Sequence, residues 1–348
     1  MEERGLEIDP LSPVLIRNLA ANESNRGNEN RAETLLLRLV GLPEPPFWIF
    51  DSLWTLYSEW GRYADAVESA KNIARLSARN GGNPSVENLA YAYAALGLDG
   101  DAEHWMDVFR SQWGGIDPPL HVSYFLAMQG AAVPGLSADL EKAEALLSAG
   151  RASDRPYVLM HGGLGWIQLG DLGKGVDWLE RGIVLYEQDM VPDGSPASID
   201  YRLLDANWWT EVVVHLAQRL AYAHGASGNE HGVGEAMKFL EQFLSSVSLP
   251  TNPKTLEMLA LTSALVGDMQ GALDHLGNAV ELGWTNYYGI VNDPAWGETL
   301  EMPEFAAVLA EARANNDRQR AIVEAADAEH DFRTEFEQLQ TVQSQAAP

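Results

Sequence analysis

Apolar and small residues recur along this chain at a spacing close to 34 residues. In each copy, apolar residues at offsets of three and four precede a glycine, and a small residue and a second apolar stripe follow it. Two adjacent copies read Leu53, Tyr57, Gly61, Ala66 and Ala70, and then Leu89, Tyr93, Gly97, Ala102 and Met106. Offsets of three and four place side chains on one face of a helix, so each copy predicts two amphipathic helices.

The glycine of each copy predicts the turn between the two helices, because glycine adopts the left-handed conformation without steric cost. These marker glycines are Gly27, Gly61, Gly97, Gly130, Gly170, Gly228 and Gly267. The first three intervals are 34, 36 and 33 residues, and the next three are 40, 58 and 39, which indicates insertions in the later copies. The small residue five positions after the glycine predicts a close crossing of the two helices. A hairpin of this kind buries its apolar face only against neighbouring copies.

This pattern resembles the tetratricopeptide repeat (TPR) family from about Leu6 to Ala279. The resemblance implies an all-α fold, a TPR-like right-handed α-solenoid of helical hairpins. We expect about seven repeats within residues 1–282. The segment from Leu6 to Pro10 is typical of the end of a second helix, so the first repeat is expected to be truncated and the chain to begin within a repeat.

The end of the chain departs from the repeat. Residues 283–312, with Trp284, Pro294 and Phe305, resemble the closing segment after such repeats in bacterial signalling proteins and predict a C-terminal helical cap. In that group the repeats follow an effector such as a nucleotide cyclase or a winged-helix regulator. Residues 313–348 are more polar and end in a run rich in Gln, Ser and Ala, which predicts a polar helix and a frayed tail.

In the resembled family, the first helices of the hairpins line a concave groove. Carried onto this sequence, the groove positions are Trp48, Asp51, Thr55, Glu87, Tyr91, Tyr124, Met128 and Tyr157. Aromatic side chains are frequent at binding hot spots, so we expect a protein-interaction scaffold that binds a basic or apolar peptide or protein surface. Two alternatives stay open: the aromatic residues are core, or the groove senses a small molecule as the input module of a larger signalling protein.

The longest insertion lies near residues 187–207. Long loops in a compact scaffold are often functional, so a contact loop is a hypothesis for Pro192, Tyr201, Trp208 and Trp209, with a tolerated insertion as the alternative.

Charge and composition exclude several classes of function. The chain carries 50 acidic and 23 basic residues, a net charge of −27, which repels a nucleic-acid backbone. It has no cysteine, no H-E-x-x-H motif, and only His224 and His231 flanking a turn as a candidate metal pair, so no metal and no cofactor are expected. His161-Gly162-Gly163 resembles an oxyanion sequence of esterases but lacks a G-x-S-x-G partner, so we expect helix packing there and no enzyme.

No secretory signal opens the sequence, and no apolar run approaches the ~20 residues that span a bilayer. We therefore expect no membrane insertion by this chain. The expected location is cytoplasmic as the chain stands, or periplasmic if it is the C-terminal part of a membrane-anchored signalling protein. The sequence leaves the oligomeric state open.

Overall fold

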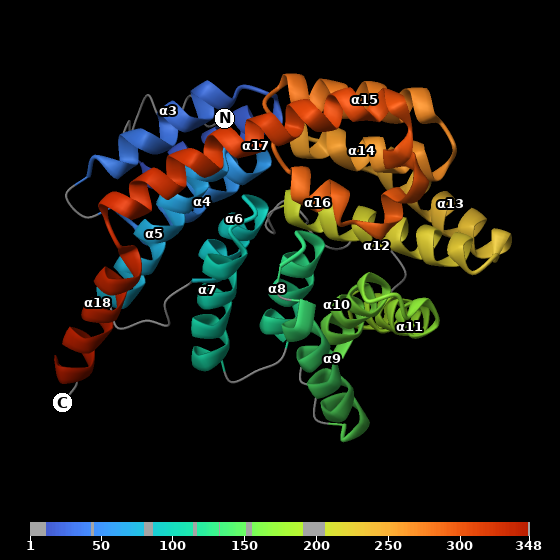
Figure 1. Ribbon diagram of the computed structural model, residues 1–348, viewed down its shortest axis with the longest axis horizontal. Coiled ribbons are helices and arrows are strands. Elements are labelled where there is room, and N and C mark those ends of the chain that lie inside the picture. The colour runs from blue at the N-terminus through green and yellow to red at the C-terminus, as the bar shows by residue number, and fades with distance from the viewer. Residues whose placement is uncertain are drawn as a thin grey trace.

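The computed structural model describes residues 12–42, 45–79, 86–113, 117–131, 133–150, 155–190 and 206–346. Within these ranges the chain is helical and has no strand, and it forms the TPR-like α-solenoid that the sequence predicts (Figure 1). The expectation for Leu6 to Pro10 lies outside the described residues. No helix in the described ranges has both the length and the apolar character needed to cross a bilayer.

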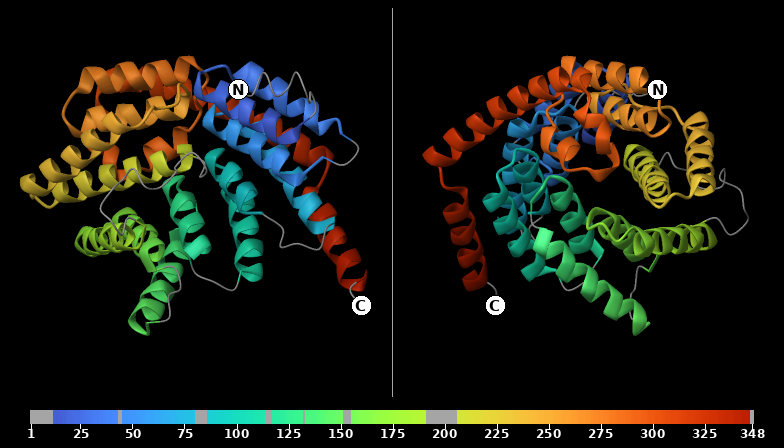
Figure 2. Two further views of the ribbon diagram at one scale, coloured as in Figure 1. Left: turned by 180° about the vertical axis from the view of Figure 1, so that it is seen from behind. Right: turned by 45° about the vertical axis from the view of Figure 1, so that its right-hand side comes forward.

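The solenoid consists of consecutive helical hairpins. Their first helices are α2 (Pro13–Asn25), α4 (Phe47–Glu59), α6 (Glu87–Ala95), α8 (Asp117–Met128), α10 (Arg155–Gln168), α12 (Ala206–Ala226) and α14 (Pro253–Leu265). Their second helices are α3 (Glu29–Val40), α5 (Tyr63–Arg79), α7 (Asp99–Gln112), α9 (Val133–Ser148), α11 (Leu172–Met190), α13 (Glu230–Ser246) and α15 (Met269–Glu281). The hairpins follow one another around a curved body (Figure 2).

The marker glycines make the turns inside these hairpins, as predicted. Their φ angles lie between +67° at Gly97 and +86° at Gly130, in the left-handed region. At Gly97 the chain closes the turn with two backbone hydrogen bonds, from the Gly97 N–H to the Ala94 carbonyl and from the Leu98 N–H to the Tyr93 carbonyl, both 2.9 Å. This is the pattern of a helix end capped by a left-handed residue.

The two helices of a hairpin cross closely at the small residue after each turn. Ala66, Ala102 and Ala272 are fully buried there. In the α10–α11 hairpin Gly175 takes this place, and a Cβ on it would lie 2.5 Å from Cγ1 of Ile167. A Cβ on Gly162 would lie 2.4 Å from the Trp178 ring, so the glycines after His161 serve helix packing.

The C-terminal segment runs across the turns of three successive hairpins. It consists of α16 (Tyr287–Val291), the 3-10 helix η1 (Pro294–Glu301), α17 (Pro303–Glu329) and α18 (Phe332–Ala346). The Thr285 hydroxyl donates to the Gly61 carbonyl at 2.5 Å, the Tyr288 ring covers Gly97, and Asn292 lies against Gly130. Figure 1 shows α17 crossing from α15 towards α5.

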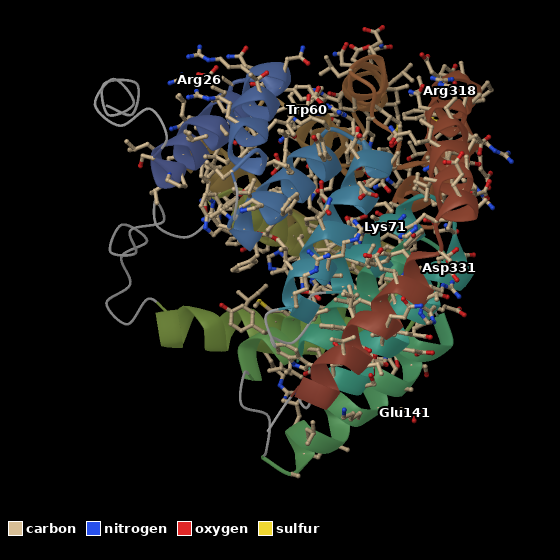
Figure 3. All side chains as sticks on the ribbon, turned by 90° about the vertical axis from the view of Figure 1, so that its left-hand side faces the viewer. Arg26, Trp60, Lys71, Glu141, Arg318 and Asp331 are labelled. Carbon is tan, nitrogen blue, oxygen red and sulfur yellow. The ribbon has the colours of Figure 1, made fainter. Side chains whose placement is uncertain are left out.

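Residues 313–346, for which the sequence predicts a polar helix and the start of a frayed tail, form the rest of α17 and all of α18. Helix α17 continues without a break through the expected boundary at residue 312, and α18 packs beside α5 on the flank shown in Figure 3, near Lys71. The Phe332 and Phe336 rings lie 5.5 and 5.3 Å from the Trp105 ring, between centroids. Together with Leu339 they form an apolar stripe at helical spacing on an otherwise polar helix, and this stripe holds α18 to the solenoid.

Candidate functional site: a central cavity closed by the C-terminal segment

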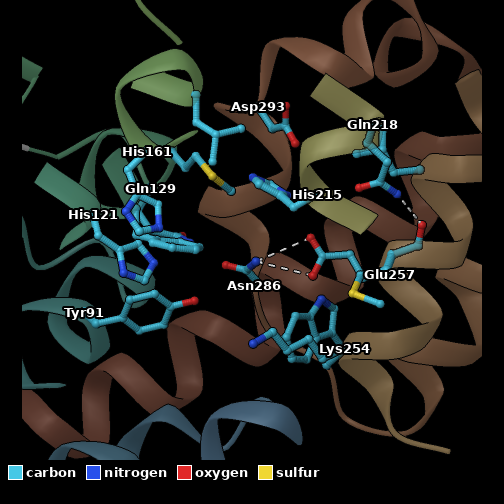
Figure 4. A pocket seen from close by; sticks show the side chains of 16 residues that line it. Tyr91, His121, Gln129, His161, His215, Gln218, Lys254, Glu257, Asn286 and Asp293 are labelled. Atoms are coloured by element: carbon cyan, nitrogen blue, oxygen red, sulfur yellow. Dashed lines mark hydrogen bonds between the residues drawn. The ribbon is translucent and has the colours of Figure 1, made fainter. Parts of the chain in front are cut away.

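A cavity lies where the first helices of the hairpins face the C-terminal segment (Figure 4). Side chains from α6, α8, α10, α12 and α14 form most of its wall, and residues 284–293 close it. Its volume is about 100 Å³. A single buried water needs roughly 10–15 Å³, so the cavity can hold several waters or a small molecule.

Aromatic rings form a continuous row along one side of the cavity. The Trp54 and Tyr91 rings are 5.8 Å apart between centroids, Tyr91 and Phe125 are 5.7 Å apart, and Phe125 and His215 are 6.2 Å apart. These rings come from four first helices: α4, α6, α8 and α12. Each of these four hairpins therefore contributes one ring to a shared surface, of which the Tyr91, Phe125 and His215 rings line the cavity.

Two histidines lie face to face in the wall. The His121 and His161 rings have centroids 4.1 Å apart and an interplanar angle of 1°. Each precedes the marker glycine of its repeat, Gly130 or Gly170, by nine residues, so the two hairpins deliver them to the same level of the solenoid. Burial, with the His161 and Lys254 charges nearby, holds the pKa of His121 well below its ordinary value. The His121 ring is therefore neutral near neutral pH.

Behind the cavity wall, a series of buried, hydrogen-bonded side chains leads to a third histidine of the wall, His215. Arg219, which has no exposed surface, donates to Oδ2 of Asp293 at 2.5 Å and to the Tyr124 hydroxyl at 3.3 Å. The Tyr124 hydroxyl is hydrogen-bonded in turn to Nε2 of His215. Burial raises the pKa of Tyr124 to about 12, so the hydroxyl keeps its proton.

This chain of hydrogen bonds decides which nitrogen of His215 carries the proton. The Tyr124 oxygen accepts from Arg219, so the tyrosine proton is directed at Nε2 of His215. Burial, with the Arg219 and Lys254 charges, holds the pKa of His215 well below its ordinary value. A neutral imidazole that accepts at Nε2 carries its hydrogen on Nδ1, so His215 keeps one N–H donor besides the bond to Tyr124.

Helix α14 brings an acid and a base to the cavity one turn apart, Glu257 and Lys254. The first turn of α14 is ordered by Asn252, whose side chain accepts from the Thr255 N–H. Burial raises the pKa of Glu257 to about 7, against the hydrogen bonds that Asn286 donates to both carboxylate oxygens at 3.4 Å. This carboxyl group therefore exchanges its proton close to neutral pH.

The structure brings part of the predicted groove set to this cavity. Tyr91 and Met128 line it, Tyr124 is buried directly behind the wall, and the partly buried Tyr157 ring lies 6.4 Å from His161.

The other four predicted groove residues lie apart from the cavity. Trp48, Asp51 and Thr55 are partly buried on α4, and Glu87 is partly buried at the start of α6. The Arg17 guanidinium lies 5.5 Å from the centre of the Trp48 ring. Burial, with Asp51 nearby, raises the pKa of Glu87. These four residues form a second stretch of the first-helix face, on α4 and α6.

The proposed contact loop falls largely outside the described residues. Pro192 and Tyr201 are not described, and Trp208 and Trp209 belong to α12 but their side chains are not described. Their role as partner contacts stays a prediction.

Sequence reasoning missed the polar half of the cavity. It assigned His161 to helix packing alone, and the histidines that it considered as a candidate metal pair were His224 and His231. In the structure, His224 is hydrogen-bonded to Asn229 at the end of α12. One feature of the sequence could have indicated that His121 and His161 lie together: each stands nine residues before the marker glycine of its repeat. Among the described residues, no group of three or more histidine, aspartate or glutamate side chains is placed to hold a metal ion.

No protein-family model and no curated protein matches this chain. Among solved structures, 21 chains match. One of them is the crystal structure of the APC/C hetero-tetramer Cut9–Hcn1; it has 13% sequence identity and a TM-score of 0.43, and the match covers 90% of this chain and 51% of that chain. This chain thus spans about half the length of that neighbour.

Proposed function

We propose that this chain is a non-enzymatic binding scaffold that holds a small organic molecule in its central cavity. The observation that carries the proposal is the make-up of the cavity wall. Apolar and aromatic side chains such as Tyr91, Phe125 and Leu261 form most of it, and a few polar groups, among them Lys254 and Glu257, converge on the same space. Small-molecule sites typically combine an apolar wall with a few placed polar groups.

The polar groups around the cavity support binding rather than catalysis. Tyr124 and Arg219 hold His215 from behind the wall, and Asp293 is engaged by Arg219. These hydrogen bonds fix the orientation of the His215 ring and the nitrogen that carries its proton. A binding site requires such fixed polar groups. A site for nucleophilic catalysis would in addition need a nucleophile within hydrogen-bond reach of its activating base.

The position of the cavity supports a sensory role. A bound molecule would contact the hairpins of the solenoid and residues 284–293 at the same time, so occupancy would stabilise the docking of the C-terminal segment. This coupling fits an input module of a larger bacterial signalling protein, in which a ligand changes the order of a connecting segment.

Protein docking on the first-helix face is the second candidate. Trp48, Asp51 and Thr55 are partly exposed on α4, beside the row of rings that begins at Trp54. A TPR-like scaffold suggests protein partners, and the aromatic and acidic character of this stretch suits a basic or apolar peptide segment.

Binding of a fluorinated aromatic fragment library, followed by ¹⁹F NMR, tests the proposal. Met258 lines the cavity, so Met258→Trp should fill it, whereas Leu282→Trp adds the same ring at an exposed site outside it. Fragments that bind the unmodified chain and Leu282→Trp but not Met258→Trp would support the cavity. If no fragment distinguishes the two variants, the small-molecule function is wrong and the peptide-docking candidate takes its place.

A further inference from the structure

Two side-chain amides in the cavity wall are buried with an unsatisfied oxygen. Gln129, directly after α8, is 2% exposed, and Asn286, directly before α16, is 7% exposed. Within the part of the chain that the structure describes, neither Oε1 of Gln129 nor Oδ1 of Asn286 has a hydrogen-bond partner. A buried acceptor left unsatisfied costs free energy, so such an oxygen normally meets a water or a ligand.

Glu257 determines which way the Asn286 amide points. The Asn286 nitrogen donates to both carboxylate oxygens of Glu257 at 3.4 Å. An ionised carboxylate only accepts hydrogen bonds, so these two bonds hold the amide nitrogen towards Glu257. Figure 4 shows the result: the Asn286 oxygen faces away from Glu257, towards the side of the cavity on which Tyr91 and His121 lie. This oxygen is therefore presented to a guest.

The charges of the wall favour an uncharged guest. The two carboxylates that line the cavity already have partners: Arg219 pairs with Asp293, and Asn286 donates to Glu257. Lys254 places a positive charge in the same wall. An ammonium guest would lose its hydration there without gaining a counter-ion of its own. A carboxylate guest would bring only further acceptors to the two unsatisfied amide oxygens.

Resting on the proposed cavity function, we infer that the ligand is a small uncharged aromatic amine. Its ring lies against Tyr91 and Phe125, and its N–H groups donate to the amide oxygens of Gln129 and Asn286. An aromatic amine suits these acceptors better than a phenol does, because its amino group carries two N–H donors and its nitrogen lone pair is delocalised into the ring. The N–H of His215 is a donor of the same wall, and the π face of the ring can accept it.

Three fluorinated probes test the inference: 4-fluoroaniline, 4-fluorotoluene and 4-fluorobenzoate, titrated at pH 7 and followed by ¹⁹F NMR. The aniline and the toluene differ only by an amino group in place of a methyl group, so their comparison isolates the N–H donors. The aniline should bind the unmodified chain about tenfold tighter than the toluene, since only the aniline satisfies the buried oxygens. The benzoate should bind weakest.

A variant of the wall checks which atom receives the N–H. Gln129→Met removes the amide oxygen and keeps the length of the side chain. It should weaken binding of 4-fluoroaniline by about fivefold and leave 4-fluorotoluene within about twofold. Gln270→Met, the same change at an exposed position on α15, should alter neither affinity. The comparison of probes on the unmodified chain stands by itself if Gln129→Met does not fold.

Equal affinities of the aniline and the toluene would overturn the amine class, and waters would then satisfy the two oxygens. Tightest binding of the benzoate would overturn it too, as would silence of all three probes while library fragments still bind. Equal losses of aniline and toluene affinity in Gln129→Met would overturn the role of the Gln129 oxygen. Each of these results leaves the cavity function standing, whereas silence of the whole library would overturn the cavity function itself.

Discussion

Arg219 of α12 and Asp293 of the closing segment form an ion pair at 2.5 Å, with side-chain exposures of 0% and 5%. The pair joins a first helix of the solenoid to the segment that closes the cavity, and the same guanidinium holds Tyr124. Removing one partner of a buried pair leaves an uncompensated charge, which destabilises far more than the intact pair stabilises.

Asp293→Ala should therefore lower the free energy of unfolding by about 3–5 kcal/mol, measured by chemical denaturation. Asp177→Ala is the matched control, because it removes an exposed partner of Arg181 on α11 and should change stability by about 0.5 kcal/mol or less. Equal effects of the two substitutions would contradict the structural role of the Arg219–Asp293 pair.

Gly97→Ala should destabilise the chain more than Gly228→Ala. Both glycines have positive φ, +67° and +72°, so both variants lose about 1–2 kcal/mol to the backbone. Only at Gly97 does the new methyl group also meet a side chain, the Tyr288 ring at 2.4 Å. Thermal denaturation should show the difference, and the double variant Gly97→Ala/Tyr288→Ala should show smaller losses than the sum of the two single variants. Strict additivity would mean that α16 does not lie on the Gly97 turn.

Phe336→Ala should destabilise the protein by about 3–5 kcal/mol, since Phe336 is 1% exposed and its ring contacts Trp105. Val342→Ala in the same helix is the control: Val342 is 68% exposed, and its loss should change stability by about 0.5 kcal/mol or less. If Phe336→Ala had as little effect as the control, α18 would behave as the frayed tail that the sequence predicts.

Glu257→Gln should make the protein more stable at high pH and leave it unchanged at low pH. The pKa of Glu257 is about 7 in the fold and near 4.5 when unperturbed, so between these values the native state holds a proton that the unfolded state has released. Stability contributed by this group is complete below about pH 4.5 and is lost as the pH rises through about 7.

At pH 8.5 the variant should be more stable than the unmodified chain by about 3 kcal/mol, measured by urea denaturation across the pH range. His121 and His215 change stability in the opposite direction on acidification, because their pKa values are lowered by burial. The comparison of variant and unmodified chain cancels their contribution. A stability difference that does not depend on pH would show that Glu257 is not buried as described.

The sequence by itself determined the all-α repeat architecture. Marker glycines such as Gly61 and Gly97 predicted the turns, and all seven of them have positive φ. The alanines five residues later predicted the close helix crossings. These features are local: each depends on residues within one hairpin, so spacing in the sequence is enough to reveal it.

The cavity was decided by tertiary structure alone. Tyr91 and Met128 were placed on the groove by their repeat offsets, but nothing local to Asp293 or Glu257 indicates that they reach the same space. That depends on the curvature of the solenoid and on the return of the C-terminal segment across the Gly61, Gly97 and Gly130 turns. The raised pKa of Glu257 and the pairing of Arg219 arise from burial among residues far apart in the chain. Sequence periodicity reveals the local structure that neighbouring residues adopt. A site whose side chains come from six elements forms only when those elements pack together.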